Sequence, residues 1–212
     1  SRRSRQHRLS WSERWYLREV LVAWIAARVV VGAALALTRF ISQTVSDEGG
    51  SLPTTDLLGW DAGWYFNIAE NGYEGAGDES RRFFPLLPML VRLLTVLPGL
   101  GGQAGSVQLV VVNLAAIGFA LAVVGVARLE GFGDEAIRRL IWLTALAPPA
   151  FVLVMGYSEA LAGLLAAIAF LGARTRRWEL AAVAALLSGL CRPLGLLLAV
   201  PIAVEAARGL PL

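Results

Sequence analysis

Long apolar runs separated by short polar segments limit the fold of this chain more than any other feature. A helix rises about 1.5 Å per residue, so it needs about 20 apolar residues to cross the roughly 30 Å of hydrocarbon in a bilayer. Runs close to this length cover residues 19–41, 106–128, 140–156, 157–173 and 179–207. We therefore predict an all-α, polytopic transmembrane protein, in which residues 1–212 form one domain with about five spanning helices.

The composition agrees with a membrane protein and narrows the chemistry that it can perform. Hydrophobic residues make up 57% of the 212 positions and charged residues only 17%, which is too apolar for a single soluble core. All 19 basic residues are Arg; the one His, His7, lies in the polar N-terminal tail, and Cys191 is the one cysteine. Lysine Schiff bases, histidine triads, disulfides and histidine or thiolate metal sites are thereby excluded. Carboxylates and Arg have to carry any catalysis.

The distribution of charge predicts which side of the membrane each segment occupies. Residues 1–18 carry six Arg and one Glu, so this flank and the later Arg128, Arg138 and Arg139 are predicted to be cytoplasmic. Residues 42–105, which hold half of the 16 acidic residues, then form a long outer loop. Because the Arg residues lie at the ends of apolar runs, the basic pI indicates topology and predicts no nucleic-acid partner.

The outer loop contains an unusual mixture of charged and aromatic side chains between residues 60 and 88. Such a mixture suits the membrane surface, where aromatic rings lie half in water. Residues 83–97, interrupted by two Pro and one Arg, are too short to span and are predicted as an interfacial or re-entrant helix. The loop is either a membrane-interface belt or a binding surface, and six of its residues are candidate acceptor or sugar contacts: Trp60, Trp64, Tyr65, Tyr73, Arg81 and Arg82.

Two Arg residues interrupt the apolar runs. Arg28 lies within the first run, and we expect it to snorkel or to face other helices. Arg192 lies within residues 179–207, which form either one long kinked helix or a tight hairpin, because Pro193 and two Gly residues loosen the backbone there. If that run is one helix rising from the cytoplasm, Arg192 lies in the outer third of the membrane.

The predicted topology brings Asp61, Glu159 and Arg192 to the same side of the membrane. A carboxylate base beside a cation placed for a phosphate suits group transfer from a lipid phosphate. Each residue also has a structural alternative. Asp61 could be the N-cap of the short helix that follows it, Glu159 could neutralise Arg192 or Arg28, and Arg192 could be purely structural.

Four segments resemble a known family when they are taken in order. The sequences WDAGWYFNIAENGY, FFPLLPML, YSEALAGLL and SGLCRPLGLLL, spread between residues 60 and 198, are similar to motifs of the GPI mannosyltransferase 2 family and its bacterial relatives. The resemblance implies an inverting glycosyltransferase of the C superfamily (GT-C) that uses polyprenyl-phosphate-mannose as its donor. It also implies a bacterial plasma-membrane protein that works on the outer face.

The resemblance assigns roles to individual residues. By similarity Asp61 is the catalytic base, and Tyr157, Glu159 and Arg192 line the donor site, with Arg192 near the phosphate. The acceptor would be a glycolipid or a saccharide, no cofactor besides the lipid-linked donor is implied, and a divalent metal is left open. Pro193 replaces an Asn of the eukaryotic motif, which indicates a different acceptor. Family members have further spans, so the chain is expected to be the N-terminal part of a longer module.

Two functions from other classes also fit the residues. In a transporter or lipid flippase, Arg192 and Glu159 would form a translocation path, and the two halves of the chain would show internal symmetry, which the sequence lacks. In a membrane scaffold the outer loop would bind a partner, and the substitution Asp61→Asn would be tolerated. A mannosyltransferase would not tolerate that substitution.

Overall fold

A computed structural model describes residues 15–46 and 56–208. This part of the chain is entirely helical, without a strand, so the predicted all-α class is confirmed. Its elements, with 3-10 helices marked η, are α1 (Trp15–Ser46), α2 (Asp61–Gly75), η2 (Asp78–Arg82), α3 (Leu86–Thr95), α4 (Ala104–Leu129), α5 (Asp134–Leu146), η3 (Pro148–Leu153), α6 (Glu159–Arg174), α7 (Trp178–Cys191), η4 (Pro193–Leu198) and α8 (Ala199–Arg208).

Two of the described helices, α1 and α4, are long and apolar enough to cross a membrane. Large hydrophobic side chains on their surfaces are exposed, among them Val29, Phe40, Val110 and Leu114, as suits helices in contact with lipid. The other expected spans form shorter helices, of 13 residues in α5, 16 in α6 and 14 in α7. Helix length therefore supports two spans, and the total of about five stays a prediction.

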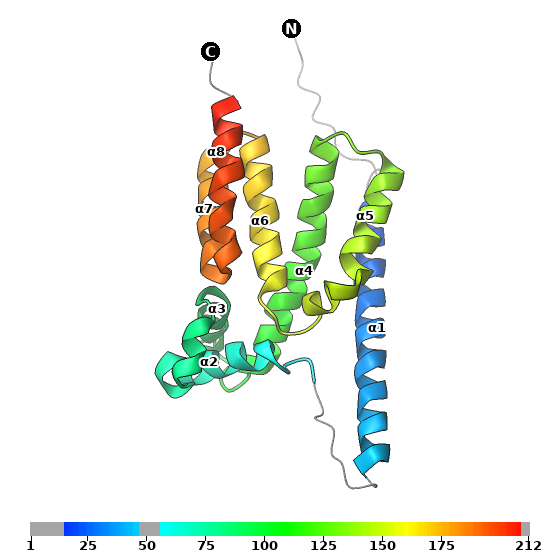
Figure 1. Cartoon of the computed structure of the whole chain (residues 1–212), viewed down its shortest axis with the longest axis vertical. Helices are drawn as coiled ribbons and strands as arrows, with labels where there is room; N and C mark the ends of the chain where they lie inside the picture. Colours follow the sequence, from blue (N-terminus) through cyan, green and yellow to red (C-terminus); the bar gives the residue numbers. More distant parts are fainter. Residues whose placement is uncertain (1–14, 47–55, 209–212) are drawn as a thin grey trace.

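The helices form two groups that share α4 (Figure 1). On one side α4 packs against α1 and α5, and on the other it packs against α6, which in turn packs against α7. The shorter helices α2 and α3 lie together at the end of the molecule where α4 and α6 begin (Figure 1). A buried cluster that includes Tyr65, Leu87, Val112, Leu161 and Cys191 joins α2 and α3 to α4, α6 and α7. The predicted outer loop is thus packed onto the bundle.

The run at residues 179–207 is a hairpin, one of the two arrangements that the sequence left open. Helix α7 ends at Cys191, whose sulfur lies 3.4 Å from the carbonyl oxygen of Ser158 at the start of α6. Arg192 is extended, with φ −153° and ψ 146°, and η4 and α8 return toward the opposite end. There Arg174, at the end of α6, donates to Glu205 on α8 over 2.8 Å. One continuous kinked helix would not bring these groups together.

A close approach of two backbones closes the hairpin. A Cβ atom added to Gly195 would lie 2.2 Å from the carbonyl carbon of Ser188 and 2.3 Å from the amide nitrogen of Gly189. No side chain fits at such distances, so η4 contacts α7 only because residue 195 is a glycine. The hairpin places Arg192 at its tip, beside the first turn of α6.

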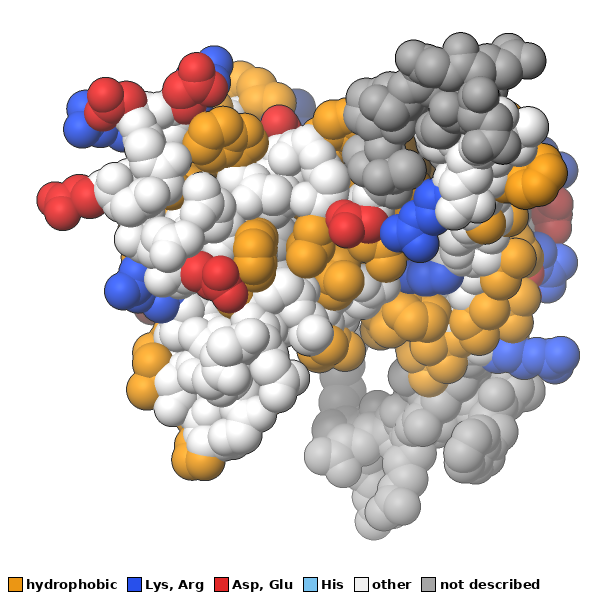
Figure 2. Space-filling model, turned by 90° about the horizontal axis from the view of Figure 1, so that it is seen from below, with side chains coloured by type: hydrophobic (Ala, Val, Ile, Leu, Met, Phe, Trp, Pro, Cys, Tyr) orange, Lys and Arg blue, Asp and Glu red, His pale blue; other side chains and the backbone are white. Residues whose placement is uncertain are grey.

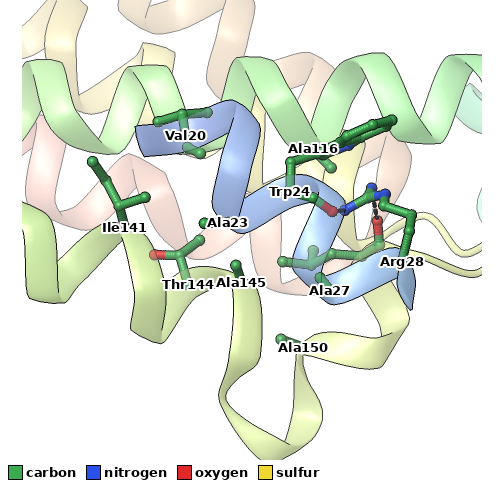
Figure 3. A pocket seen from close by; sticks show the side chains of 12 residues that line it. Val20, Ala23, Trp24, Ala27, Arg28, Ala116, Ile141, Thr144, Ala145 and Ala150 are labelled. Atoms are coloured by element: carbon green, nitrogen blue, oxygen red, sulfur yellow. Dashed lines mark hydrogen bonds between the residues drawn. The ribbon is translucent and has the colours of Figure 1, made fainter. Parts of the chain in front are cut away.

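Small side chains bring α1 close to α4 and α5 around a cavity of about 20 Å³ (Figure 3). Arg28 lies at its edge and uses its guanidinium on neutral acceptors: the Asn113 side chain at 2.8 Å, the Leu153 carbonyl at 3.0 Å and the Trp24 carbonyl at 3.2 Å. Arg28 therefore faces other helices, as expected, and ties α1 to α4 and η3.

Candidate active site

Asp61 is the first residue of α2, and Trp60 occupies the N-cap position without a side-chain capping hydrogen bond. The Asp61 side chain is exposed. Within residues 15–46 and 56–208 its carboxylate makes no hydrogen bond or ion pair. Asp61 thus begins the helix, does not cap it, and presents its carboxylate to solvent.

The backbone just before Asp61 is strained. Trp60 has φ 52° and ψ −128°, a conformation that a large side chain adopts rarely and at a cost of about 1–3 kcal/mol. The bend is held from both sides, because the Ala62 amide donates to the Gly59 carbonyl and the Gly63 amide donates to the Trp60 carbonyl. Strain of this kind gathers at functional sites, where packing forces an otherwise unfavourable geometry. The bend determines the direction in which α2, and with it Asp61, begins.

Gln108, a residue that the sequence analysis did not select, fixes α2 to the segment that precedes α6. Its side chain on α4 is fully buried, and the amide nitrogen donates to the carbonyls of Ala62 at 2.9 Å and Gly156 at 2.6 Å. The Gly156 amide in turn donates to the Leu57 carbonyl at 2.8 Å. One side chain therefore holds together the two chain segments that carry Asp61 and Tyr157, residues that lie 96 positions apart in the sequence.

Tyr157 lies beside Asp61. Its hydroxyl is within electrostatic range of the Asp61 and Glu159 carboxylates and within hydrogen-bonding reach of the Asp61 backbone. Its ring packs with Ala62 and Met155 in a small buried cluster. The first and third of the four motifs thus meet, as residues 157–159 approach the start of α2.

Tyr65 continues the site along the same face of α2, since residues four apart in a helix lie one above the other. Its hydroxyl is hydrogen-bonded to Ser158 at 2.9 Å, and the side chain is buried. Burial raises the pKa of the Tyr65 phenol, which also lies in the field of Arg192 and Glu159. Tyr65 is therefore a neutral buried link between α2 and α6 that borders the charged pair.

Arg192 and Glu159 form an ion pair at the tip of the hairpin. Their side chains retain 37% and 29% exposure, and the second Glu159 oxygen is buried without a hydrogen-bond partner among the described residues. The pair lies at a groove of about 360 Å³ whose other walls are mainly small and apolar, formed by Ala162, Gly163, Ala166, Ser188, Leu194, Gly195 and Leu198. An apolar groove with a charged rim suits a lipid that carries a charged head group.

The remaining candidate contacts lie farther along α2 and in η2. Trp64 stacks on Phe83 with 5.6 Å between ring centroids, and the Tyr73 hydroxyl donates to the Phe83 carbonyl at 2.8 Å. Arg81 and Arg82 are exposed and pair with Asp78 and Glu79 over 3.1 Å and 2.6 Å, respectively. Seen from this end, charged side chains alternate with hydrophobic patches over the surface (Figure 2). Contact of these residues, and of Trp60, with an acceptor stays a prediction.

The described residues hold no group of three or more His, Cys, Asp or Glu side chains that could bind a metal ion. Glu159, the acidic residue of the third motif, is paired with Arg192. A divalent ion near Asp61 would take most of its ligands from water and from a substrate phosphate, as Mg²⁺ commonly does.

Two long apolar helices suggest a membrane protein, and the carboxylates, tyrosines and one Arg that meet near the start of α2 and α6 are typical of an enzyme site. The family model described as Mannosyltransferase (PIG-V) matches residues 23–203, and the chain belongs to this family. It is therefore a mannosyltransferase, which confirms the resemblance drawn from the four motifs and favours an enzyme over a transporter or a scaffold. Neither a curated protein nor a solved structure matches the chain.

Proposed function

We propose that this protein transfers mannose from polyprenyl-phosphate-mannose to a hydroxyl of a glycolipid or saccharide, with inversion at the anomeric carbon. The observation that carries the proposal is the exposed carboxylate of Asp61, which has no ion-pair partner among the described residues and starts α2 next to Tyr157. Tyr157 is followed in sequence by Ser158, which is hydrogen-bonded to Tyr65, and by Glu159. Glu159 pairs with Arg192 at the groove.

Asp61 acts as the base in this reaction. Its carboxylate removes the proton from the acceptor hydroxyl while the acceptor oxygen bonds to the anomeric carbon and the bond from that carbon to the phosphate oxygen breaks. A base must lie within hydrogen-bond reach of the proton that it removes, and the exposed Asp61 side chain leaves room for such an acceptor. Attack from the face opposite the phosphate gives inversion.

Arg192 stabilises the phosphate as it leaves. A guanidinium offers parallel N–H donors that match phosphate oxygens, and a charged donor of this kind contributes most where negative charge develops. In the structure Glu159 is the partner of Arg192, and we propose that the donor phosphate shares or replaces this contact. The groove beside the pair then takes the first part of the polyprenyl chain.

The proposed orientation places the ends of α2 and α3 outside and the polar turns after α4 and α6 in the cytoplasm of a bacterial cell. It is supported by Arg128, Arg174, Arg176 and Arg177, which lie at the end opposite α2, since cytoplasmic flanks are rich in Arg and Lys.

Asp61→Asn tests the base, with Glu70→Gln as a matched control on the exposed surface of the same helix. The measurement is transfer of radiolabelled mannose from polyprenyl-phosphate-mannose to membrane lipids at equal protein amounts. Loss of a general base costs about 10²–10⁴-fold in rate, so Asp61→Asn should reduce transfer by that factor with donor binding retained. The Glu70→Gln protein should match the wild type. Undiminished transfer by Asp61→Asn would remove Asp61 from the mechanism.

A further inference from the structure

Gln108 on α4 is the one buried amide side chain among the described residues, and its two acceptors adjoin the candidate site. Ala62, the first acceptor, follows Asp61, and Gly156, the second acceptor, precedes Tyr157. The Tyr157 hydroxyl in turn lies within hydrogen-bonding reach of the Asp61 backbone. A closed ring of contacts therefore runs from Gln108 through Asp61 and Tyr157 and back to Gln108.

The space around the Gln108 amide is tightly filled. A Cβ atom added to Gly156 would lie 2.9 Å from the Gln108 side-chain nitrogen and 2.9 Å from a Leu58 methyl carbon. A residue with a Cβ atom could not approach the amide this closely, so the contact requires glycine at this position. Ala62, on the other side, is fully buried. The separation of the two carbonyls is therefore set by the single nitrogen atom between them.

Stability alone does not explain an amide at this position. The side-chain oxygen of Gln108 is buried without a hydrogen-bond partner among the described residues, and a buried polar atom without a partner lowers the stability of a fold. An apolar side chain of similar length, such as that of Met, would bury no such oxygen. A polar group that is kept at such a cost can specify one arrangement of the chain. The arrangement specified here is that of Asp61 relative to Tyr157.

Asp61 depends on its backbone for its position, because its carboxylate makes no ion pair or hydrogen bond with the described residues. The proposed donor groove has contacts of its own. Tyr65 is hydrogen-bonded to Ser158 at 2.9 Å, and Gln108 is not among the residues that line the groove. Loss of the Gln108 amide would therefore displace the proposed base and leave the donor groove unchanged.

We propose that Gln108 is a positioning residue for mannosyl transfer, which holds Asp61 at the distance from the acceptor hydroxyl that proton removal requires. The inference rests on the role of Asp61 in the function proposed above. A methyl group keeps about 3.3–3.6 Å from a carbonyl oxygen, whereas the Gln108 nitrogen holds its two carbonyl oxygens at 2.9 and 2.6 Å. In Gln108→Met each carbonyl has to withdraw by several tenths of an ångström, and Asp61 moves with the start of α2.

The first measurement separates catalysis from donor binding. The values of kcat and of the KM for polyprenyl-phosphate-mannose are measured for the wild type and Gln108→Met at equal amounts of folded protein. Because a misplacement of about 1 Å can cost about 10²-fold in rate, kcat should fall by up to that factor while the donor KM stays unchanged. An unchanged kcat, or a loss of transfer that lies wholly in the donor KM, would overturn the inference.

Gln103→Met is the matched control. Gln103 lies just before α4, is exposed, and also donates to a backbone carbonyl, that of Gly99 at 3.0 Å. The substitution removes a contact of the same chemical kind outside the site, so kcat should equal that of the wild type. An equal fall in kcat for Gln103→Met and Gln108→Met would overturn the specific role of Gln108.

Gly156→Ala reaches the same amide from the other side and replaces Gln108→Met if that protein does not fold. The added methyl group would lie 2.9 Å from the Gln108 nitrogen, so the amide has to leave its place between the two carbonyls. The expected result is again a lower kcat with an unchanged donor KM. Full kcat in a folded Gly156→Ala protein would overturn the inference.

A double-mutant comparison decides whether Gln108 acts through Asp61. Transfer is measured for Asp61→Asn, for Gln108→Met and for the protein with both changes, over incubations long enough to detect slow variants. Once the carboxylate is gone its position no longer matters, so Gln108→Met should cost nothing further in the Asp61→Asn protein. The same loss in both backgrounds would make Gln108 a general structural residue. If Asp61→Asn transfers too little to measure, Asp61→Glu takes its place, because its longer side chain already displaces the carboxylate.

The same proteins separate failure of this inference from failure of the proposed function. If transfer is lost in Asp61→Asn but kept in Gln108→Met, the proposed function stands and the role of Gln108 alone is overturned. If Asp61→Asn transfers mannose at the full rate, the proposed base is wrong, and the positioning role of Gln108 falls with it.

Discussion

Arg28 and Arg192 both interrupt apolar runs, yet the regions around them are built differently. Arg28 lies in the middle of the long helix α1 and donates to three neutral oxygens from α1, α4 and η3. Arg192 lies where a helix ends, in extended backbone, and pairs with the Glu159 carboxylate. Arg28 is bound by neighbouring helices, and Arg192 lies at the edge of a groove.

The difference shows how a structural Arg can be told from one that binds a substrate. When each of the three guanidinium nitrogens already donates to a fixed backbone or amide oxygen, as in Arg28, binding a new anion requires breaking contacts between helices. When the partner is a single carboxylate and about a third of the side chain is exposed, a phosphate can enter the same contact. A charge within an apolar run does not by itself separate a structural Arg from one that binds a substrate, because Arg28 and Arg192 both lie in such runs.

The largest expected effect is on transfer rate, and it separates the two Arg residues. Removing a cation that stabilises a leaving phosphate costs about 10²–10³-fold in kcat, so Arg192→Gln should lose that much per folded molecule. Arg28→Gln should lose far less when rates are normalised to folded protein. Mannose transfer from polyprenyl-phosphate-mannose measures both variants. Equal losses in the two variants would break the comparison.

Two glycines test the backbones around the two Arg residues. Gly195→Ala would place a methyl group 2.2 Å from the Ser188 carbonyl carbon, and it should lower stability by about 3 kcal/mol or more, because the hairpin backbones have to separate.

Gly32→Ala on α1 is the matched control, because nothing lies within 4 Å of its added Cβ. It should raise helix stability by up to about 1 kcal/mol. Thermal unfolding in detergent compares the two variants with the wild type. A stable Gly195→Ala protein would mean that the hairpin is not closed at this point.

Arg28→Met should weaken the N-terminal region in a measurable way. The substitution keeps much of the side-chain volume but removes three hydrogen bonds and leaves the Asn113 oxygen without its donor, a loss of about 2–3 kcal/mol. Adding Asn113→Ala should cost little more, since the two residues act as one unit. Unfolding of the two single variants and the double variant measures this coupling, and fully additive losses would contradict it.

The smallest expected effect belongs to Glu159→Gln. Both members of the Arg192–Glu159 pair are partly exposed, and such pairs contribute about 1 kcal/mol or less to stability. The variant should therefore unfold within a few degrees of the wild type. A large loss of stability would show that the ion pair is a structural element comparable with Arg28, contrary to the distinction drawn above.

Local patterns predicted several parts of the fold and the site. Helix α2 begins at Asp61, where the sequence predicted a short helix, and Gly72 with φ 72° interrupts it near its end. Helix α3 occupies residues 86–95, within the predicted short helix. The approach of residues 157–159 to Asp61 also follows from the topology, because two turns on the same side of a small bundle have little room to avoid each other.

Other features depend on contacts that no local pattern reports. The direction of the chain after Arg192 depends on whether residue 195 can touch the backbone of α7, and this requires both segments in place. Gln108 did leave a signal, since an amide side chain near the start of the apolar run 106–128 needs a partner if it is buried. Its two carbonyl acceptors could not be inferred without the fold.

The shortness of α7 has a mechanical consequence for a surrounding bilayer. Fourteen residues span about 21 Å, roughly 9 Å less than a typical hydrocarbon core. If α7 spans the membrane, as the sequence predicts, and its first residue lies at one surface, its last residue meets the other surface only where the lipid is compressed. Each ångström of compression carries a modest elastic cost, so membrane thickness would then control the proposed contact between Arg192 and the donor phosphate. Short-chain lipids would bring the phosphate plane down to Arg192, and long-chain lipids would lift it out of reach.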